Sequence, residues 1–158
     1  MKKIIFLLSL GIFASCQNTN SELVIERLNE KVDQWHLDAS EANFDSYFGF
    51  IAEDGIFIGT DVSERWSKEE FAEFSKPYFD RGQAWSFTKK ERIVRLNKRK
   101  DVAWFDEVLD TWMGDCRSTG VLSLKDGEWK LDHYQLSVTI DNELMAQFLE
   151  ITKSTSNE

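Results

Sequence analysis

Apolar residues recur at helical spacing through the first half of the chain, which predicts three amphipathic helices. Ser40 can cap the second helix, and Ser67 with Glu70 has the capping-box pattern that begins the third. Pro77 is predicted to end that third helix. The apolar faces are Ile25, Leu28, Val32 and Trp35 over residues 22–39, then Phe44, Tyr47, Phe48 and Ile51, then Phe71 and Phe74.

After residue 83 the apolar period shortens to two, as in half-buried β-strands. Four strands are predicted, at residues 84–97, 101–112, 116–125 and 128–140. A short strand is expected at 56–58, and Asn142 can cap a short last helix. Helices followed by a run of antiparallel strands indicate an α+β fold with helices packed on one face of a curved sheet.

The N-terminus predicts export from the cytoplasm. Lys2 and Lys3 precede an uncharged apolar run, residues 4–13, that is too short for a stable transmembrane helix. We therefore expect a signal peptide over residues 1–15. The Ala14-Ser15-Cys16 ending resembles the lipobox of bacterial lipoproteins, in which the cysteine becomes the lipidated first residue. The alternative is an ordinary cleaved signal with an incidental cysteine.

This interpretation divides the chain into a lipidated Cys16 with a polar tether to residue 21, one domain over residues 22–152, and a polar tail over 153–158. It places the protein in the cell envelope, lipid-anchored to a bacterial membrane on its periplasmic face or at the cell surface. The lipid would be the only membrane contact.

Composition and motifs argue against several classes of partner and bound group. The net charge of −9 disfavours nucleic acid as a partner. With Cys16 lipidated, Cys116 has no disulfide partner, and no Cys/His cluster has the spacing of a metal site. No phosphate loop, dinucleotide fingerprint or nucleophile elbow occurs, so we expect neither a cofactor nor a metal.

The element order resembles the nuclear transport factor 2-like superfamily, and the local sequence resembles its SnoaL-like branch. The matching pieces are Gly59-Thr60-Asp61 with Glu64 and Trp66, Pro77, Phe79, Trp85, Arg92, residues 104–107, residues 116–122, residues 129–131, Tyr134, Leu136 and Ser137. The resemblance implies a cone-shaped, curved antiparallel or mixed sheet. Three N-terminal helices would pack on its concave face and enclose a pocket, and a short helix would end the chain. It also implies dimers through the opposite sheet face, but no particular activity.

Strand alternation assigns side chains to the two faces of the last strand. Trp129 and Leu131 are taken as core, which would point His133, Gln135 and Ser137 into the pocket. A β-bulge would instead leave His133 exposed. The opposite face, Tyr134, Leu136, Val138 and Ile140, is predicted to form a homodimer interface.

Two acidic residues on the second long strand are candidates for acid–base chemistry. Alternation does not decide whether Glu107 or Asp106 faces the pocket. Glu107 lies among apolar neighbours, so it could be a general base or could pair with Arg117 on the next strand. Arg117 could instead hold a ligand anion, with Thr119 beside it.

Aromatic residues complete the predicted site. Trp35, Trp66 and Trp85 are candidate ligand contacts, the last two being favoured because they flank the third helix, whereas His36 is interpreted as a surface or rim residue. We expect a homodimeric domain that binds a small, partly apolar ligand. The alternatives are a cofactor-free isomerase, cyclase or dehydratase using Glu107 or Asp106 with His133 or Tyr134, and an assembly domain without a ligand.

Overall fold

The computed structural model describes the backbone of residues 10–155 and the side chains of residues 20–153. The first nine residues of the predicted signal peptide, and the side chain of Cys16, lie outside these described residues. The helices are α1 (Leu10–Ser40), α2 (Phe44–Phe50), α3 (Lys68–Asp80), the short 3₁₀ helix η1 (Asn142–Leu144) and α4 (Met145–Thr155). The strands are β1 (Ile51–Ile58), β2 (Arg65–Ser67), β3 (Thr88–Leu96), β4 (Val102–Thr111), β5 (Gly114–Lys125) and β6 (Glu128–Val138).

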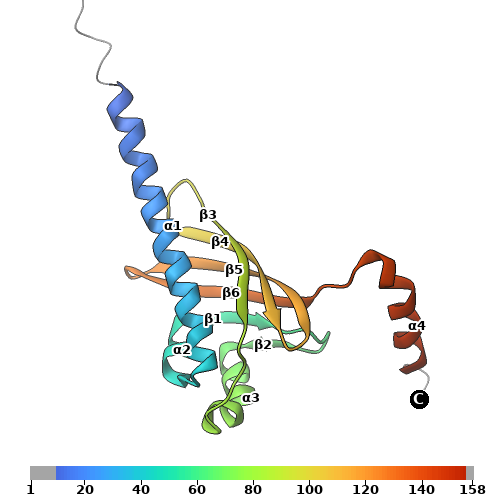
Figure 1. Ribbon diagram of the computed structural model, residues 1–158. Coiled ribbons are helices and arrows are strands. Elements are labelled where there is room, and N and C mark those ends of the chain that lie inside the picture. Colours follow the sequence, from blue (N-terminus) through green and yellow to red (C-terminus); the bar gives the residue numbers. More distant parts are fainter. Residues whose placement is uncertain (1–9, 156–158) are drawn as a thin grey trace, which may run out of the picture.

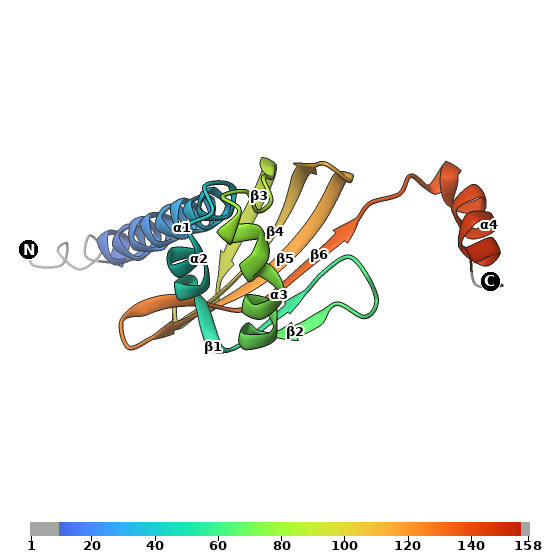
Figure 2. The same ribbon diagram turned by 90° about the horizontal axis from the view of Figure 1, so that it is seen from below.

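The strands form one curved, mixed sheet in the order β2-β1-β6-β5-β4-β3. All neighbours are antiparallel except β1 and β6, which are parallel. Helices α1, α2 and α3 lie together on one side of the sheet (Figures 1 and 2). The predicted α+β cone is therefore confirmed.

The core lies between these helices and the concave sheet face. Trp35 of α1 is 2 % exposed, stacks on Tyr47 with ring centroids 4.9 Å apart, and meets the edge of Tyr134 at 4.8 Å. Gly120 of β5 lies under the ring of Phe105 of β4, where a Cβ atom would come within 2.3 Å of the ring. Large aromatic side chains thus fill most of the cone.

Of the helix-end signals predicted from the sequence, the one at Ser67 is confirmed and those at Pro77 and Ser40 are wrong. The capping box at Ser67 is present, with the side chain of Ser67 accepting from the N–H of Glu70 and Glu70 accepting from the N–H of Ser67. Pro77 does not end α3, which continues to Asp80 because the burial of Phe79 anchors the last turn. Asn43, rather than Ser40, precedes α2. The backbone of residues 17–21, which has no apolar periodicity, continues α1.

A β-bulge in β6 overturns the predicted faces of that strand. Leu131 pairs with Leu122 and His133 with Val121, so Asp132 is an extra residue in β6. After the bulge the alternation is inverted, because each residue moves to the opposite face. Tyr134 and Leu136 are buried in the core, while Gln135 is exposed.

The C-terminal helix lies apart from the body. The hydroxyl and N–H of Thr139 both bond the carbonyl of Asp115, which fixes the end of β6 beside the β4–β5 turn. Beyond this point η1 and α4 project away from the sheet (Figure 1). The exposed apolar side chains of this segment are Leu144, Met145, Phe148, Leu149 and Ile151.

Candidate functional site

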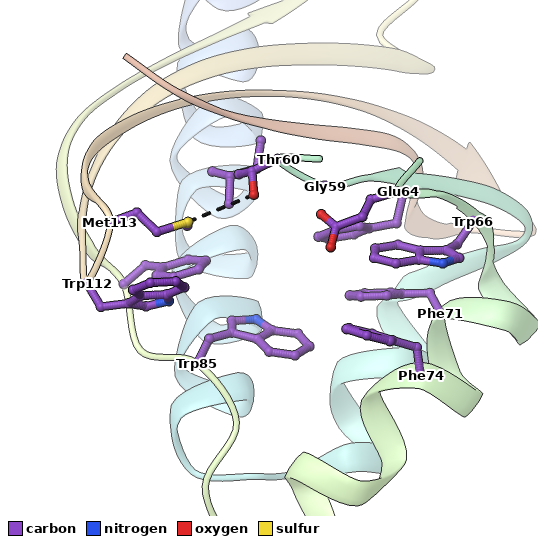
Figure 3. Close-up of a pocket in the computed structure, with 12 residues that line it drawn as sticks. Gly59, Thr60, Glu64, Trp66, Phe71, Phe74, Trp85, Trp112 and Met113 are labelled. Atoms are coloured by element: carbon purple, nitrogen blue, oxygen red, sulfur yellow. Dashed lines mark hydrogen bonds between the residues drawn. The ribbon is translucent and has the colours of Figure 1, made fainter. Parts of the chain in front are cut away.

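An aromatic pocket opens beside α3 and has a volume of about 140 Å³. Its twelve lining residues come from the β1–β2 hairpin, α3, the segment before β3, the β4–β5 turn and β6 (Figure 3). They are Phe57, Gly59, Thr60, Glu64, Trp66, Phe71, Phe74, Trp85, Phe87, Trp112, Met113 and Leu136. We call this site the aromatic pocket.

The rings on one wall of the aromatic pocket are stacked. Trp66 lies 5.5 Å from Phe71 and 4.8 Å from Phe74, with interplanar angles of 18° and 22°. Phe57 also stacks on Phe71, with ring centroids 3.8 Å apart and an interplanar angle of 15°. Such stacks hold flat apolar surfaces in fixed positions, and a planar ligand ring can pack against them.

Polar groups are few in the aromatic pocket. Among the described residues that line it, Glu64 alone is charged, and its carboxylate points into the space (Figure 3). One carboxylate oxygen of Glu64 accepts a hydrogen bond from the N–H of Asp61, 3.1 Å away. Thr60 bonds the sulfur of Met113 at 3.9 Å. Glu64 retains capacity to accept a hydrogen bond from a ligand.

A second, buried site is centred on Glu107 of β4. Strand register places Arg92 of β3 and Ser118 of β5 directly beside it. Arg92 binds Oε2 with its Nε at 2.8 Å and its second amino group at 2.7 Å. Ser118 donates to Oε1 at 2.7 Å, and the hydroxyl of Tyr134 donates to the same atom at 3.2 Å. We call these residues, with His36, the Glu107 cluster.

The Glu107 cluster receives its last member from α1. The Nε2 atom of His36 lies 2.9 Å from Oε1 of Glu107. Arg92 also reaches α1, with bonds to the carbonyl of Asn29 at 3.1 Å and to Asp33 at 2.6 Å. Lys89 binds the same Asp33 at 2.6 Å. The cluster therefore fastens α1 to strands β3, β4 and β5 of the sheet.

The surroundings of Glu107 favour its charged form. Burial raises its pKa, but the hydrogen bond to His36, the charges of His36 and Arg92 and the bond from Ser118 lower it to about 2. The pKa of Tyr134 is raised, first by burial and then by the negative charge of Glu107. Glu107 is thus an ionised carboxylate, and both of its oxygens already accept hydrogen bonds. This arrangement suits a residue that stabilises the fold and positions its neighbours better than one that abstracts a proton.

The structure brings only some of the predicted site residues together. Glu107 faces inward, and Trp66 and Trp85 line the aromatic pocket as expected. Trp35 is a core residue instead. The ion pair of Glu107 is with Arg92, so the prediction that Arg117 is its partner is wrong. Arg117 is exposed and lies 3.9 Å from Asp106.

The prediction that the remaining candidate residues line the same pocket as Glu107 is also wrong. Arg117, Thr119 and Asp106 alternate with the buried positions of β5 and β4, so they face the outer side of the sheet. The β6 bulge sends His133, Gln135 and Ser137 to that same side. The predicted dimer face fails for the same reason, because Tyr134 and Leu136 are buried.

Several residues of the two sites could not be identified from the sequence. His36 and Glu107 are separated by 71 residues, and no local pattern links them. Arg92 sits in a run of cations that alternation spreads over both faces of the hairpin. Trp112 and Met113 enter the aromatic pocket from a turn, where no period assigns a direction.

A family comparison decides the relationship of this chain. The model of the SnoaL-like domain matches residues 28–141. The chain belongs to the SnoaL-like domain family. A comparison with curated proteins found no match.

Solved structures of other proteins share the fold at low sequence identity. A nuclear transport factor 2-like protein of unknown function from Pseudomonas putida KT2440 has a TM-score of 0.65 and 14 % identity, covering 78 % of this chain and 92 % of its own. The association domain of C. elegans CaMKII has a TM-score of 0.63 and 17 % identity, covering 75 % and 98 %. A Parabacteroides distasonis ATCC 8503 protein, proposed to be a ketosteroid isomerase, has a TM-score of 0.59 and 16 % identity, covering 73 % and 87 %.

Proposed function

We propose that this SnoaL-like domain binds a small, planar, partly apolar molecule in the aromatic pocket. The observation that carries the proposal is the stacked wall of Trp66, Phe71 and Phe74 facing an open space with Glu64 as its one charged group. Ligand sites are commonly apolar cavities with a few placed polar groups. The volume of about 140 Å³ is close to that of cavities of ~150 Å³ known to hold one benzene molecule.

Indole is a suitable probe, because it combines a flat ring with an N–H group that can donate a hydrogen bond to the carboxylate of Glu64. We expect saturable binding of indole to the wild type, measured by equilibrium dialysis. Trp66→Ala removes one stacking surface and is expected to weaken binding roughly threefold to tenfold. Trp104→Ala is the matched control, because Trp104 lies on the outer sheet face. Absence of saturable binding, or an equal loss in both variants, would contradict the proposal.

The enzyme alternative that uses Glu107 as a base is less well supported. Four side chains already bond its carboxylate, and its pKa is about 2. Asp106 lies on the outer face, away from the helices. The geometry thus favours binding over proton abstraction by either acid.

A lipid anchor at Cys16 is the second part of the proposal. Its support is the charged, then apolar, N-terminus followed by Ala14-Ser15-Cys16. Within the described residues no helix is long and apolar enough to cross a membrane. Cys16→Ser should move the protein from the membrane fraction to the soluble fraction of cells, and Cys116→Ser is the control. A Cys16→Ser protein that stays in the membrane fraction would disprove the anchor.

A homodimer through the outer sheet face is the third part. Strand register aligns Ile56, His133, Val121 and Trp104 in one row across β1, β6, β5 and β4. Trp104 is 42 % exposed at one end of this row. The same face carries Arg117 and Asp106, so two copies related by a two-fold axis can pair opposite charges. A second copy of this chain is therefore the proposed occupant.

Sedimentation measurements test the homodimer. Trp104→Glu replaces the large apolar side chain at the end of this row by a negative charge and should shift the protein toward monomer. Val62→Glu is the control, because Val62 is fully exposed in the β1–β2 loop. A wild type that stays monomeric at high concentration, or a Trp104→Glu variant that stays dimeric, would exclude this interface.

A further inference from the structure

A groove beside α1 shares only Phe87 with the aromatic pocket among the described residues that line them. Its volume is about 370 Å³, larger than that of the aromatic pocket. It lies between α1 and the chain leading into β3. The residues that line it are Asp33, His36, Leu37 and Ser40 of α1, with Ser86, Phe87, Thr88 and Lys89. We call this site the α1 groove.

His36 connects the α1 groove to the Glu107 cluster. Its Nε2 atom is 2.9 Å from Oε1 of Glu107, and its ring lines the groove. An ionised carboxylate can only accept hydrogen bonds, so Nε2 is the nitrogen that carries the proton. In the neutral ring Nδ1 then holds a free lone pair. The ring is also held in place by Trp35 at 5.2 Å and by Phe87 and Tyr134 at 6.4 Å.

No residue described in the structure bonds the Nδ1 atom of His36. The single polar contact of this side chain is the one to Glu107, and its Nδ1 is not among the buried side-chain atoms that lack a partner. Nδ1 is therefore reachable from solvent, although only 10 % of the side chain is exposed. A lone pair held at the wall of a groove is suited to accept a hydrogen bond from a ligand.

We infer that the α1 groove binds a small phenol-like hydroxyl compound, with the hydroxyl group donating to Nδ1 of His36 and Glu107 acting as the positioning residue. Phe87 offers a ring face to the apolar part of such a ligand, and Ser40, Ser86 and Thr88 offer hydroxyl partners at the rim. Carboxylate–histidine pairs of this type fix the orientation and tautomer of the ring.

The same arrangement supports proton transfer from the bound hydroxyl. The O–H bond breaks, the oxygen keeps the electron pair, and the proton forms a bond to Nδ1. The resulting imidazolium lies directly against the carboxylate of Glu107. The other charges facing His36 are balanced, because Arg92 and Lys89 are paired with Glu107 and Asp33. Glu107, with its pKa near 2, stays ionised at neutral pH to hold the new cation.

The tautomer of His36 can be measured directly on the full chain in detergent. The sequence has two histidines, and His133, on the outer face, is an internal reference. Long-range proton–nitrogen NMR should show Nε2 protonated and Nδ1 bare in the neutral form of His36. On addition of phenol, the Nδ1 resonance of His36 should shift and that of His133 should not. A proton on Nδ1, or equal shifts in both histidines, would overturn the inference.

Two variants separate this site from the aromatic pocket. His36→Phe keeps a ring but removes both nitrogens, so it should weaken phenol binding in the α1 groove at least tenfold while leaving indole binding unchanged. Trp66→Ala should do the reverse, with phenol still shifting His36. Diethyl pyrocarbonate labelling of the wild type adds a check that needs no variant: phenol should slow the modification of His36 and leave the modification rate of His133 unchanged. Labelling of His36 that proceeds equally fast with and without phenol would contradict the inference.

Discussion

The imidazole of His36 and the carboxylate of Glu107 meet at 2.9 Å, although 71 residues separate them in the chain. His36 belongs to α1 and Glu107 to β4, beside the edge strand β3. Arg92 closes the same contact from β3, with 1 % of its side chain exposed. The join between helix and sheet is thus partly ionic, within a core that is otherwise mostly aromatic. Its energetic consequences can be measured residue by residue.

Neutralising Glu107 should be costly. Glu107→Gln keeps the shape of the side chain but leaves the buried guanidinium of Arg92 without its buried countercharge. Breaking a buried pair in this way is expected to lower the free energy of unfolding by about 3–5 kcal/mol. Asp106→Asn is the matched control, because Asp106 is adjacent in sequence but faces outward. It should change stability by less than about 0.5 kcal/mol in urea unfolding. Similar losses for both variants would refute the assignment.

The two arginines should differ strongly on truncation. Arg92→Ala strands the carboxylate of Glu107 and removes the bonds to Asn29 and Asp33, so a loss of about 3–5 kcal/mol is expected. Arg117→Ala removes an exposed pair at 3.9 Å and should cost about 0–1 kcal/mol. Thermal melts of the two variants compare them directly. A costly Arg117→Ala would mean that the outer face matters more for the monomer than its exposure implies.

Acid should remove the contribution of the Glu107 charge to the free energy of unfolding over a defined pH range. Its pKa falls from an ordinary value of 4.5 to about 2 on folding, so the folded state holds the charge more strongly than the unfolded state. The contribution, roughly 3 kcal/mol, is present above pH 4.5 and is lost as the pH falls toward 2. The stability gap between wild type and Glu107→Gln, measured by urea unfolding, should therefore shrink across this range. A constant gap would indicate that ionisation of Glu107 is not its source.

Gly120 should not tolerate a side chain. A Cβ atom there would lie 2.3 Å from ring atoms of Phe105, so Gly120→Ala is expected to destabilise the fold by about 1–3 kcal/mol. Gly49→Ala is the control, because Gly49 lies in α2 with no atom within 4 Å of its added Cβ. Alanine in this helix should stabilise by about 0.5–1 kcal/mol. Chemical denaturation checks both, and an unaffected Gly120→Ala would show that the ring of Phe105 moves aside freely.

Signals between residues that are close in sequence explain which parts of the fold could be predicted. The capping box at Ser67 acts within one helical turn, and the alternation of Phe105, Glu107 and Leu109 acts within one strand. Both signals depend on residues a few positions apart, so they are visible in the sequence. The position of α4 away from the body was not predicted, because its apolar pattern shows that it has an apolar face but not what covers that face.

The sequence by itself determined the α+β order, the long strands and the face that Glu107 shares with Phe105 and Leu109, but not that this face points inward. Only the tertiary structure decided the partners of that carboxylate, because strand pairing places Arg92 beside it and helix packing brings in His36. The extra residue Asp132 in β6 decided the faces of His133 and Tyr134. A period of two reports which residues share a face but not where one residue is added, and a single bulge inverts every position that follows.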